Sequence, residues 1–186
     1  MPQRSTPLTI ELALLGFVRG RPLHGYEIHQ RLCAPGGLGD VWRLKQPLLY
    51  AHLKRLEAEG FLAATVEVQS DRPARRLLAI TAAGEAAFVR WLAQPVTRGR
   101  DLRLEFLAKL FFARSEGQEM ALHLLDMQQR QICCWLDDIA AQRRELAPEA
   151  IYERLVLDYR SGQVNAALQW LAMVRSELAS SAEVQR

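Results

Sequence analysis

The sequence predicts a mainly α-helical protein with one small β-hairpin in its first half. Apolar residues recur at helical spacing in three segments before residue 60, alternate with polar residues between 66 and 80, and return to helical spacing beyond residue 100. The chain has 186 residues, 49% of them hydrophobic and 24% charged, as in ordinary globular proteins. At this length a core can form without disulfides or a structural metal.

Two short helices are expected first. One spans residues 8–18, and the glycine and proline within 20–22 end it. Its apolar positions at helical spacing are Leu8, Leu12, Leu15 and Val18. The second spans residues 23–33, and a Pro-Gly-Gly loop at 35–37 follows it.

A third helix is expected to begin after Gln46, because the proline that follows suits the first helical turn, and to close at Gly60. Its buried face is predicted from leucines at 4-3 spacing: Leu49, Leu53 and Leu56. The opposite face then carries Pro47, Tyr50, Ala51 and Lys54, with His52 and Arg55 on the flank.

A two-stranded hairpin follows, since Val66 and Val68 flank a charged residue and the alternation resumes at Leu78 after a turn over residues 70–74. Three basic residues are expected at or near its exposed tip: Arg72, Arg75 and Arg76. Thr81 is the expected N-cap of a closing helix. Three helices, a two-stranded β wing and a closing helix are the elements of a winged helix-turn-helix.

Residues 94–100, with a proline and a glycine, are the expected linker between a winged helix-turn-helix domain over 1–93 and a helical domain over 101–186. The second domain has a 4-3 stripe typical of helices that pack on other helices: Ala121, Leu125, Gln128, Ile132, Trp135, Ile139, Gln142 and Leu146. A last helix follows Pro148. Because one chain does not fully cover such stripes, the second domain is expected to form a homodimer.

The formal net charge of +3 is unevenly distributed. Residues 1–100 carry 14 basic and 8 acidic side chains, a net charge of +6, whereas residues 101–186 carry 10 and 13, a net charge of −3. A basic first domain favours a polyanionic partner.

The three cysteines form neither a disulfide framework nor a zinc pattern, since Cys133 and Cys134 are adjacent and Cys33 stands alone. A reducing, cytoplasmic location is therefore expected, with a redox switch at the adjacent pair as an alternative. The apolar stretch Leu12–Val18 is too short to span a membrane, and no signal layout precedes it.

Catalysis is not expected, because the sequence contains no Gly-rich phosphate loop, nucleophile elbow or recognisable acid pair. No cofactor or metal site is expected either. His24 and His29 are five positions apart, which does not place them together on a helix, and capping or packing is the expected role of His24.

Three motifs follow one another in the first domain. They are His24-Gly25-Tyr26-Glu27, then Leu49-Tyr50 with Leu53, Lys54, Arg55, Leu56, Glu57 and Gly60, then Thr81 with Gly84-Glu85. Over residues 8–93 the chain thereby resembles the PadR-like transcriptional regulators. The remainder, with Arg100-Asp101 and the run Leu107–Phe112, resembles the longer helical C-terminal domain of the PadR and virulence-activator branch.

This resemblance implies a homodimer that binds a pseudo-palindromic operator in double-stranded DNA, with a small molecule, in some members a phenolic acid, modulating the affinity. A repressor is expected. By the same resemblance Tyr50 contacts the DNA backbone and Lys54 shares its face. The chain departs from the family at 45–48, where Lys-Gln-Pro-Leu replaces a small polar run, and at 77–78, where two leucines replace an aromatic residue.

Basic residues on the third helix and the wing would supply most of the DNA affinity by neutralising phosphates. Gln46 and His52 could hydrogen-bond base edges, although Gln46 could equally cap the helix. The predicted DNA-binding set is Arg43, Lys45, Gln46, Tyr50, His52, Lys54, Arg55, Arg72, Arg75 and Arg76.

Five aromatic residues could line an aromatic effector pocket or the dimer interface, with an ordinary place in the core as the alternative: Trp91, Phe111, Phe112, Trp135 and Trp170. The alternative function is a dimeric protein-interaction module without sequence-specific DNA binding, against which the basic first domain argues.

Overall fold

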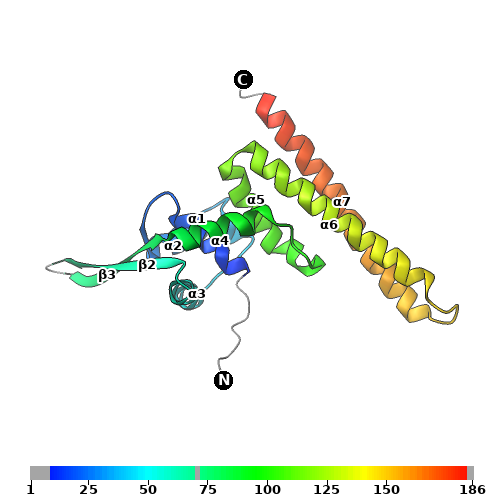
Figure 1. The fold of residues 1–186 in the computed structure, drawn as a ribbon, viewed down its shortest axis with the longest axis horizontal. Coiled ribbons are helices and arrows are strands. Elements are labelled where there is room, and N and C mark those ends of the chain that lie inside the picture. Colours follow the sequence, from blue (N-terminus) through cyan, green and yellow to red (C-terminus); the bar gives the residue numbers. More distant parts are fainter. Residues whose placement is uncertain (1–8, 70–71, 184–186) are drawn as a thin grey trace.

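The computed structural model describes residues 9–69 and 72–183 and contains helices, 3₁₀ turns (η) and one sheet (Figure 1). In chain order the elements are η1 (Ile10–Leu12), α1 (Ala13–Val18), β1 (Leu23–His24), α2 (Gly25–Leu32), η2 (Leu38–Asp40), α3 (Gln46–Ala58), β2 (Leu62–Gln69), β3 (Arg72–Ile80), α4 (Ala82–Ala93), η3 (Gly99–Arg103), α5 (Glu105–Glu116), α6 (Gln118–Arg144) and α7 (Ile151–Glu183). The predicted class, mainly helical with a winged N-terminal part and a helical C-terminal part, is confirmed.

The wing contains one strand more than the sequence predicts. The antiparallel sheet has the order β1-β3-β2, and the short β1 pairs Leu23 with Leu78 and His24 with Leu77. The helix predicted over 23–33 therefore begins at Gly25, because the two residues before it extend to reach β3. Glu27 fixes this start, since its carboxylate accepts a hydrogen bond of 2.7 Å from the His24 backbone N–H.

The second strand of the hairpin begins earlier than predicted. The sequence places a turn over residues 70–74, yet β3 begins at Arg72 and pairs that residue with Gln69. Pro73 is tolerated in the strand because β1 reaches only the far part of β3, so the missing N–H of the proline is not needed on that side. The Thr81 N-cap is confirmed, since its hydroxyl accepts a hydrogen bond of 3.0 Å from the Gly84 N–H.

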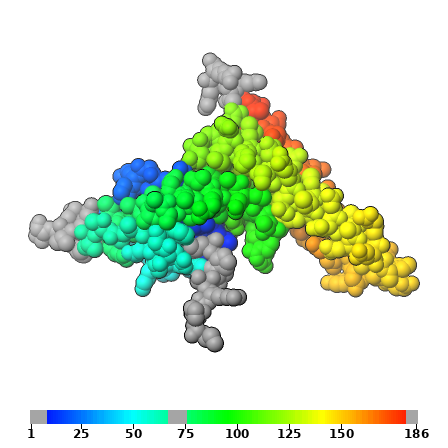
Figure 2. Space-filling model, in the orientation of Figure 1, coloured from blue at the N-terminus to red at the C-terminus, as the bar shows by residue number. Residues whose placement is uncertain are grey.

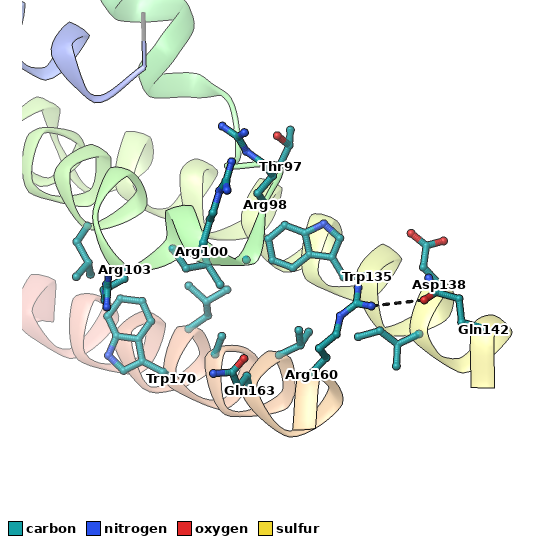
Figure 3. A pocket seen from close by; sticks show the side chains of 17 residues that line it. Thr97, Arg98, Arg100, Arg103, Trp135, Asp138, Gln142, Arg160, Gln163 and Trp170 are labelled. Carbon is teal, nitrogen blue, oxygen red and sulfur yellow. Dashed lines mark hydrogen bonds between the residues drawn. The ribbon is translucent and has the colours of Figure 1, made fainter. Parts of the chain in front are cut away.

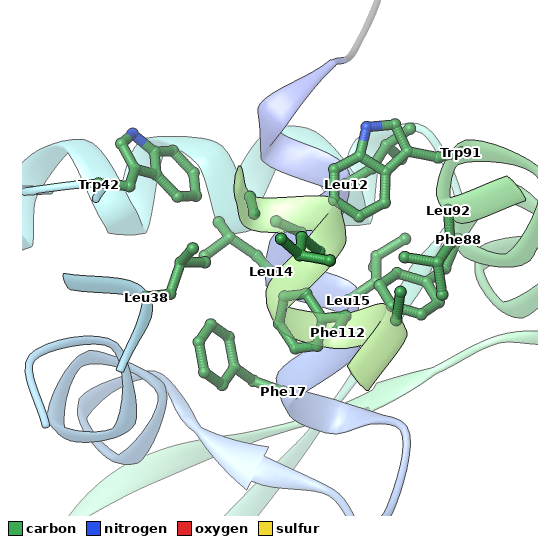
Figure 4. Close-up of a cluster of buried hydrophobic side chains, with 14 of the residues drawn as sticks. Leu12, Leu14, Leu15, Phe17, Leu38, Trp42, Phe88, Trp91, Leu92 and Phe112 are labelled. Carbon is green, nitrogen blue, oxygen red and sulfur yellow. The ribbon is translucent and has the colours of Figure 1, made fainter. Parts of the chain in front are cut away.

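The helix predicted over 8–18 divides into η1 and α1, and Leu8 lies outside the described residues. Both faces of α1 are covered, so five of its six residues are buried: Ala13, Leu14, Leu15, Phe17 and Val18. A single hydrophobic core extends from this helix through α2, α3 and α4 into α5, α6 and α7. Figure 4 shows α1 at the centre of the cluster, with Phe112 of α5 lying across it.

Phe112 joins the winged part to the C-terminal part. Its ring makes edge-to-face contacts with Phe17 of α1 at 5.3 Å and Phe88 of α4 at 5.5 Å between centroids. The contact needs a glycine beneath it, because a Cβ at Gly16 would lie 2.7 Å from Cδ1 of Phe112. The boundary predicted at 94–100 stays a prediction, and this contact passes across it.

The two long helices α6 and α7, of 27 and 33 residues, form an antiparallel hairpin that projects from the rest of the molecule (Figures 1 and 2). Most of the predicted stripe on α6 is buried, while Leu146 lies beyond the end of the helix. Ion pairs from Arg143 to Asp158 and from Arg175 to Asp126 link the two helices. Among the described residues, none of the helices has both the length and the apolar character needed to cross a membrane.

Replacing Gly16 by alanine is expected to lower the free energy of unfolding by about 1–3 kcal/mol, because a buried ring must move to admit the methyl group. This loss outweighs the helix-propensity gain of up to about 1 kcal/mol. Urea unfolding followed by circular dichroism measures the difference. Gly20→Ala is the matched control, since a Cβ at Gly20 would meet nothing within 4 Å. A Gly16→Ala protein at least as stable as the wild type would contradict the tight contact.

Candidate nucleic-acid interface

Helix α3 presents a polar face because its leucines anchor the opposite one. Leu49, Leu53 and Leu56 are at most 3% exposed. Their burial turns Tyr50 and Lys54 toward solvent. Lys45 is the N-cap residue, with its side chain exposed and not bonded to the helix, and Gln46 is the first helical residue. Gln46 is exposed and forms no side-chain hydrogen bond with the described residues, which gives no support to a capping role.

The cations beside this face are uncompensated within the described part of the chain. Arg43, Lys45 and Lys54 are exposed, and none of them forms an ion pair with a residue that the structure describes. Several basic side chains elsewhere are neutralised. Arg19, for example, pairs with Glu85 of α4 and with Glu116 at the end of α5. Arg43, Lys45 and Lys54 therefore form a group of cations, without carboxylate partners among the described residues, at the start and on the outer face of α3.

Tyr50 is held against α2 and is not part of the core. It is 45% exposed, and its ring lies so close to Gly25 that a Cβ there would be 2.6 Å from Cε1. The tyrosine, Lys54, His24 and Arg76 border a surface hollow of about 330 Å³. His24 is tied to the wing, since its Nδ1 lies 3.1 Å from the backbone oxygen of Arg76.

Two of the predicted DNA-binding residues face the flank and contact the N-terminal turn. Arg55 Nη1 is 3.3 Å from Glu11 Oε1, and His52 Nδ1 is 3.7 Å from the same oxygen. Both side chains are half-buried, and the His52 ring also packs against Trp42. The structure therefore separates them from Tyr50 and Lys54.

The wing places one predicted residue next to α3. Arg76, predicted at or near the tip of the wing, lies in the middle of β3 instead. It is exposed and pairs with Glu57 of α3 at 2.5 Å, so the wing is joined to the helix. Arg72 and Arg75 lie on β3, but their side chains are outside the part of the chain that the structure describes.

The five predicted aromatic residues do not form one site. Phe112 is in the core and Phe111 packs against it at 5.0 Å between centroids. Trp91 of α4 is buried, and its Nε1 donates a hydrogen bond of 2.9 Å to Glu105, the first residue of α5. Only Trp135 and Trp170 line a larger groove.

This groove, of about 1200 Å³, lies between residues 97–103, α6 and α7 (Figure 3). The two tryptophans supply flat apolar walls, and four arginines border it: Arg98, Arg100, Arg103 and Arg160. Arg98 pairs with Asp101 at 2.9 Å, and Arg160 donates a hydrogen bond of 3.5 Å to Gln142. The groove thus combines aromatic surface with positive charge.

The three cysteines are free and exposed. Cys133 and Cys134 are consecutive residues of α6, and Cys33 lies 3.8 Å from Nε2 of His29. No group of three or more potential metal-ligating side chains occurs among the described residues.

Sequence reasoning missed two buried polar residues that hold the backbone of the predicted linker, which we call the linker clamp: Lys109 of α5 and Gln128 of α6. Lys109 Nζ donates a hydrogen bond of 2.8 Å to the Gln94 carbonyl. Gln128 accepts from the Val96 N–H at 2.8 Å and donates to the Val96 carbonyl at 3.3 Å. Burial lowers the pKa of Lys109, against the opposing effect of nearby Glu105. The sequence signal that could have found them is a single polar residue within an apolar stretch of each helix.

Comparison with known proteins identifies the winged part. Residues 14–90 match the model of the Transcriptional regulator PadR-like family. The Negative transcriptional regulator PadR of Bacillus subtilis is 25% identical over 141 residues, which are 76% of each chain. The Probable transcriptional regulator Rv1176c of Mycobacterium tuberculosis is 30% identical over 76 residues, which are 41% of this chain and 39% of that protein.

Two solved structures resemble the fold. The Bacillus subtilis PadR complex with operator DNA has 23% identity and a TM-score of 0.44, covering 91% of this chain and 98% of that one. The smu.1604c protein of Streptococcus mutans has 22% identity and a TM-score of 0.45, covering 92% and 99%. Both scores are below 0.5, so the likeness to the family depends on the sequence matches. By those matches, the winged part of the chain is similar to the PadR-like transcriptional regulators.

Proposed function

We propose that the chain is a cytoplasmic repressor that binds operator DNA as a homodimer through α3 and the wing. The observation that carries the proposal is the exposed side of α3, where Tyr50 and Lys54 share a face, Lys45 stands at the start of the helix, and the lysines lack carboxylate partners among the described residues. Uncompensated cations on a helix face suit phosphate contacts, which release counterions. Repression is inferred from the negative regulator of Bacillus subtilis.

Within this proposal the predicted DNA-binding residues divide by position. Arg43, Lys45, Lys54 and the wing arginines contact phosphates, and Tyr50 donates its hydroxyl hydrogen to the backbone. Gln46, exposed in the first turn of α3, is the base-reading candidate, because a side-chain amide pairs with adenine in the major groove. His52 and Arg55 support the helix through Glu11.

Lys54→Ala is expected to weaken binding to all DNA sequences to a similar degree and to reduce the slope of log K against log salt by about 1, as the loss of one phosphate contact requires. Fluorescence anisotropy at several salt concentrations, with the duplex upstream of the protein's own coding region, measures both effects. Arg114→Ala removes an exposed charge from α5 and should leave binding unchanged. Wild-type binding that is weak and insensitive to salt would overturn the proposal in favour of a protein-interaction module.

The proposed dimer interface is the exposed apolar face at the start of α7. Ile151, Leu155 and Tyr159 are 61–67% exposed and recur every four residues, so they lie on one side of the helix. Adjacent Tyr152 is 75% exposed. A contiguous apolar patch of this kind marks an interaction site, and the second copy that a two-fold operator requires would cover it.

Leu155→Asp is expected to dissociate the dimer at micromolar concentration, because a buried carboxylate would have no partner in an apolar interface. Light scattering should then give a mass near the 21.1 kDa of one chain. Val89→Asp places the same charge on an exposed apolar position of α4 and should remain dimeric. A wild-type protein that is monomeric under these conditions would contradict the dimer.

We further propose that the groove between residues 97–103, α6 and α7 binds a planar aromatic carboxylate. Trp135 and Trp170 offer faces for stacking, and Arg103, which has no ion pair with the described residues, offers a charge for the carboxylate. A groove of this size, mostly apolar with a few polar groups, suits a small ligand.

Titration with p-coumaric acid, with which the Bacillus subtilis PadR has been crystallised, is expected to quench tryptophan fluorescence to saturation and to weaken DNA binding. Quenching should be strongly reduced in the double variant Trp135→Phe/Trp170→Phe, whereas Trp42→Phe, in the winged part, should retain it. Equal quenching in the double variant and the wild type would place the ligand elsewhere.

A further inference from the structure

We propose that the linker clamp, Lys109 and Gln128, sets the spacing between the two DNA half-sites that the dimer accepts. The inference depends on the proposed function, since it requires two winged domains on one duplex. In this role the two residues contact no DNA. They are positioning residues, which fix the direction in which each winged domain leaves its helical arm.

The clamp holds the linker backbone at two points. Lys109 binds the carbonyl of Gln94, immediately after the last residue of α4. Two residues later, Gln128 pairs with both the N–H and the carbonyl of Val96, as a neighbouring β-strand would. The connection between α4 and η3 is therefore attached to both α5 and α6.

Burying each clamp residue costs desolvation free energy that burying an apolar side chain would not. Lys109 is 2% exposed and Gln128 is fully buried, and they are the two buried polar or charged residues within the described ranges. All their partners are in place, and removing the Gln128 side chain leaves the N–H and the carbonyl of buried Val96 unsatisfied. Buried polar groups of this kind favour one conformation over alternatives, which is the property that a rigid connection needs.

The clamp also ties α4 to α5. Lys109 Nζ lies 3.5 Å from Glu105 and 5.2 Å above the Trp91 ring, and Glu105 accepts the Trp91 indole hydrogen bond. Together with the packing of Phe112 against α1, these contacts leave little room for movement between the winged part and the α6–α7 hairpin. Each recognition helix is then fixed relative to the dimer, and so is the distance between the two.

Such rigidity is measurable on DNA, because one inserted base pair moves a half-site by about 3.4 Å and turns it by about 35°. A dimer with clamped linkers cannot follow this movement without strain. A dimer with loosened linkers can follow it, at the entropic cost of a flexible connection.

The test is selection from a randomised duplex pool by the full-length wild type and by the variants Gln128→Met and Lys109→Met. The wild type should recover paired half-sites at one spacing, and the variants should recover the same half-site sequence at several. Inserting one base pair into the selected site should weaken wild-type binding by about tenfold or more and variant binding by less than about threefold. Gln129→Met, on the exposed neighbouring position of α6, should behave as the wild type.

Hydrogen exchange provides a readout that does not involve DNA. The Val96 amide, whose hydrogen bond to Gln128 is lost, should exchange about tenfold faster in Gln128→Met, as the loss of one buried hydrogen bond implies. Binding to a single half-site confirms that a variant is folded. If Gln128→Met fails this check, Gln128→Asn, which only shortens the side chain, takes its place.

The outcomes separate the two proposals. Identical spacing preferences in the wild type and in folded clamp variants would overturn the positioning role while leaving DNA binding intact. Recovery of no DNA by the wild type would overturn the proposed function itself, and the positioning role with it.

Discussion

The contact between Phe112 and Gly16 is the constraint on which the arrangement of the molecule depends. Because α1 lacks a side chain at that position, α5 can lay an aromatic ring directly on the central helix of the winged part. The ring also meets Phe17 and Phe88, so one core serves both halves of the chain. Helix α5, which begins the C-terminal part, is thereby packed into the core of the N-terminal part. The hairpin of α6 and α7 leaves that core in a fixed direction.

Sequence alone predicts the winged part well, since α2, α3 and α4 bury one face each and their apolar periods differ from that of the strands. The leucines of α3 determine which face of the helix is exposed, and Thr81 determines where α4 begins. The sequence could not predict β1, because two residues form a strand only when a distant partner, here Leu77 and Leu78, presents its edge. Local patterns contain no information on such pairing.

The predicted sites show the same limit. Tyr50 and Lys54 could be assigned to the exposed face from spacing alone, but the contact of His52 and Arg55 with Glu11 depends on how η1 packs against α3. From sequence alone, an aromatic residue of the core cannot be told from one that lines a site. The same is true of a lysine within an apolar run. Lys109 could be interpreted only once its partner, the Gln94 carbonyl, was placed beside it.

The groove and the linker clamp share a segment of chain, and this would give the proposed effector a physical route to the DNA. Val96, which Gln128 holds, is followed directly by Thr97 and Arg98, which line the groove. A ligand changes an equilibrium only by binding one arrangement more tightly than another. An aromatic carboxylate that binds this groove more tightly when residues 97–98 shift would pull on the residues next to the clamped backbone. Loosening the clamp would free both recognition helices from the spacing of the operator while leaving the charge of α3 unchanged.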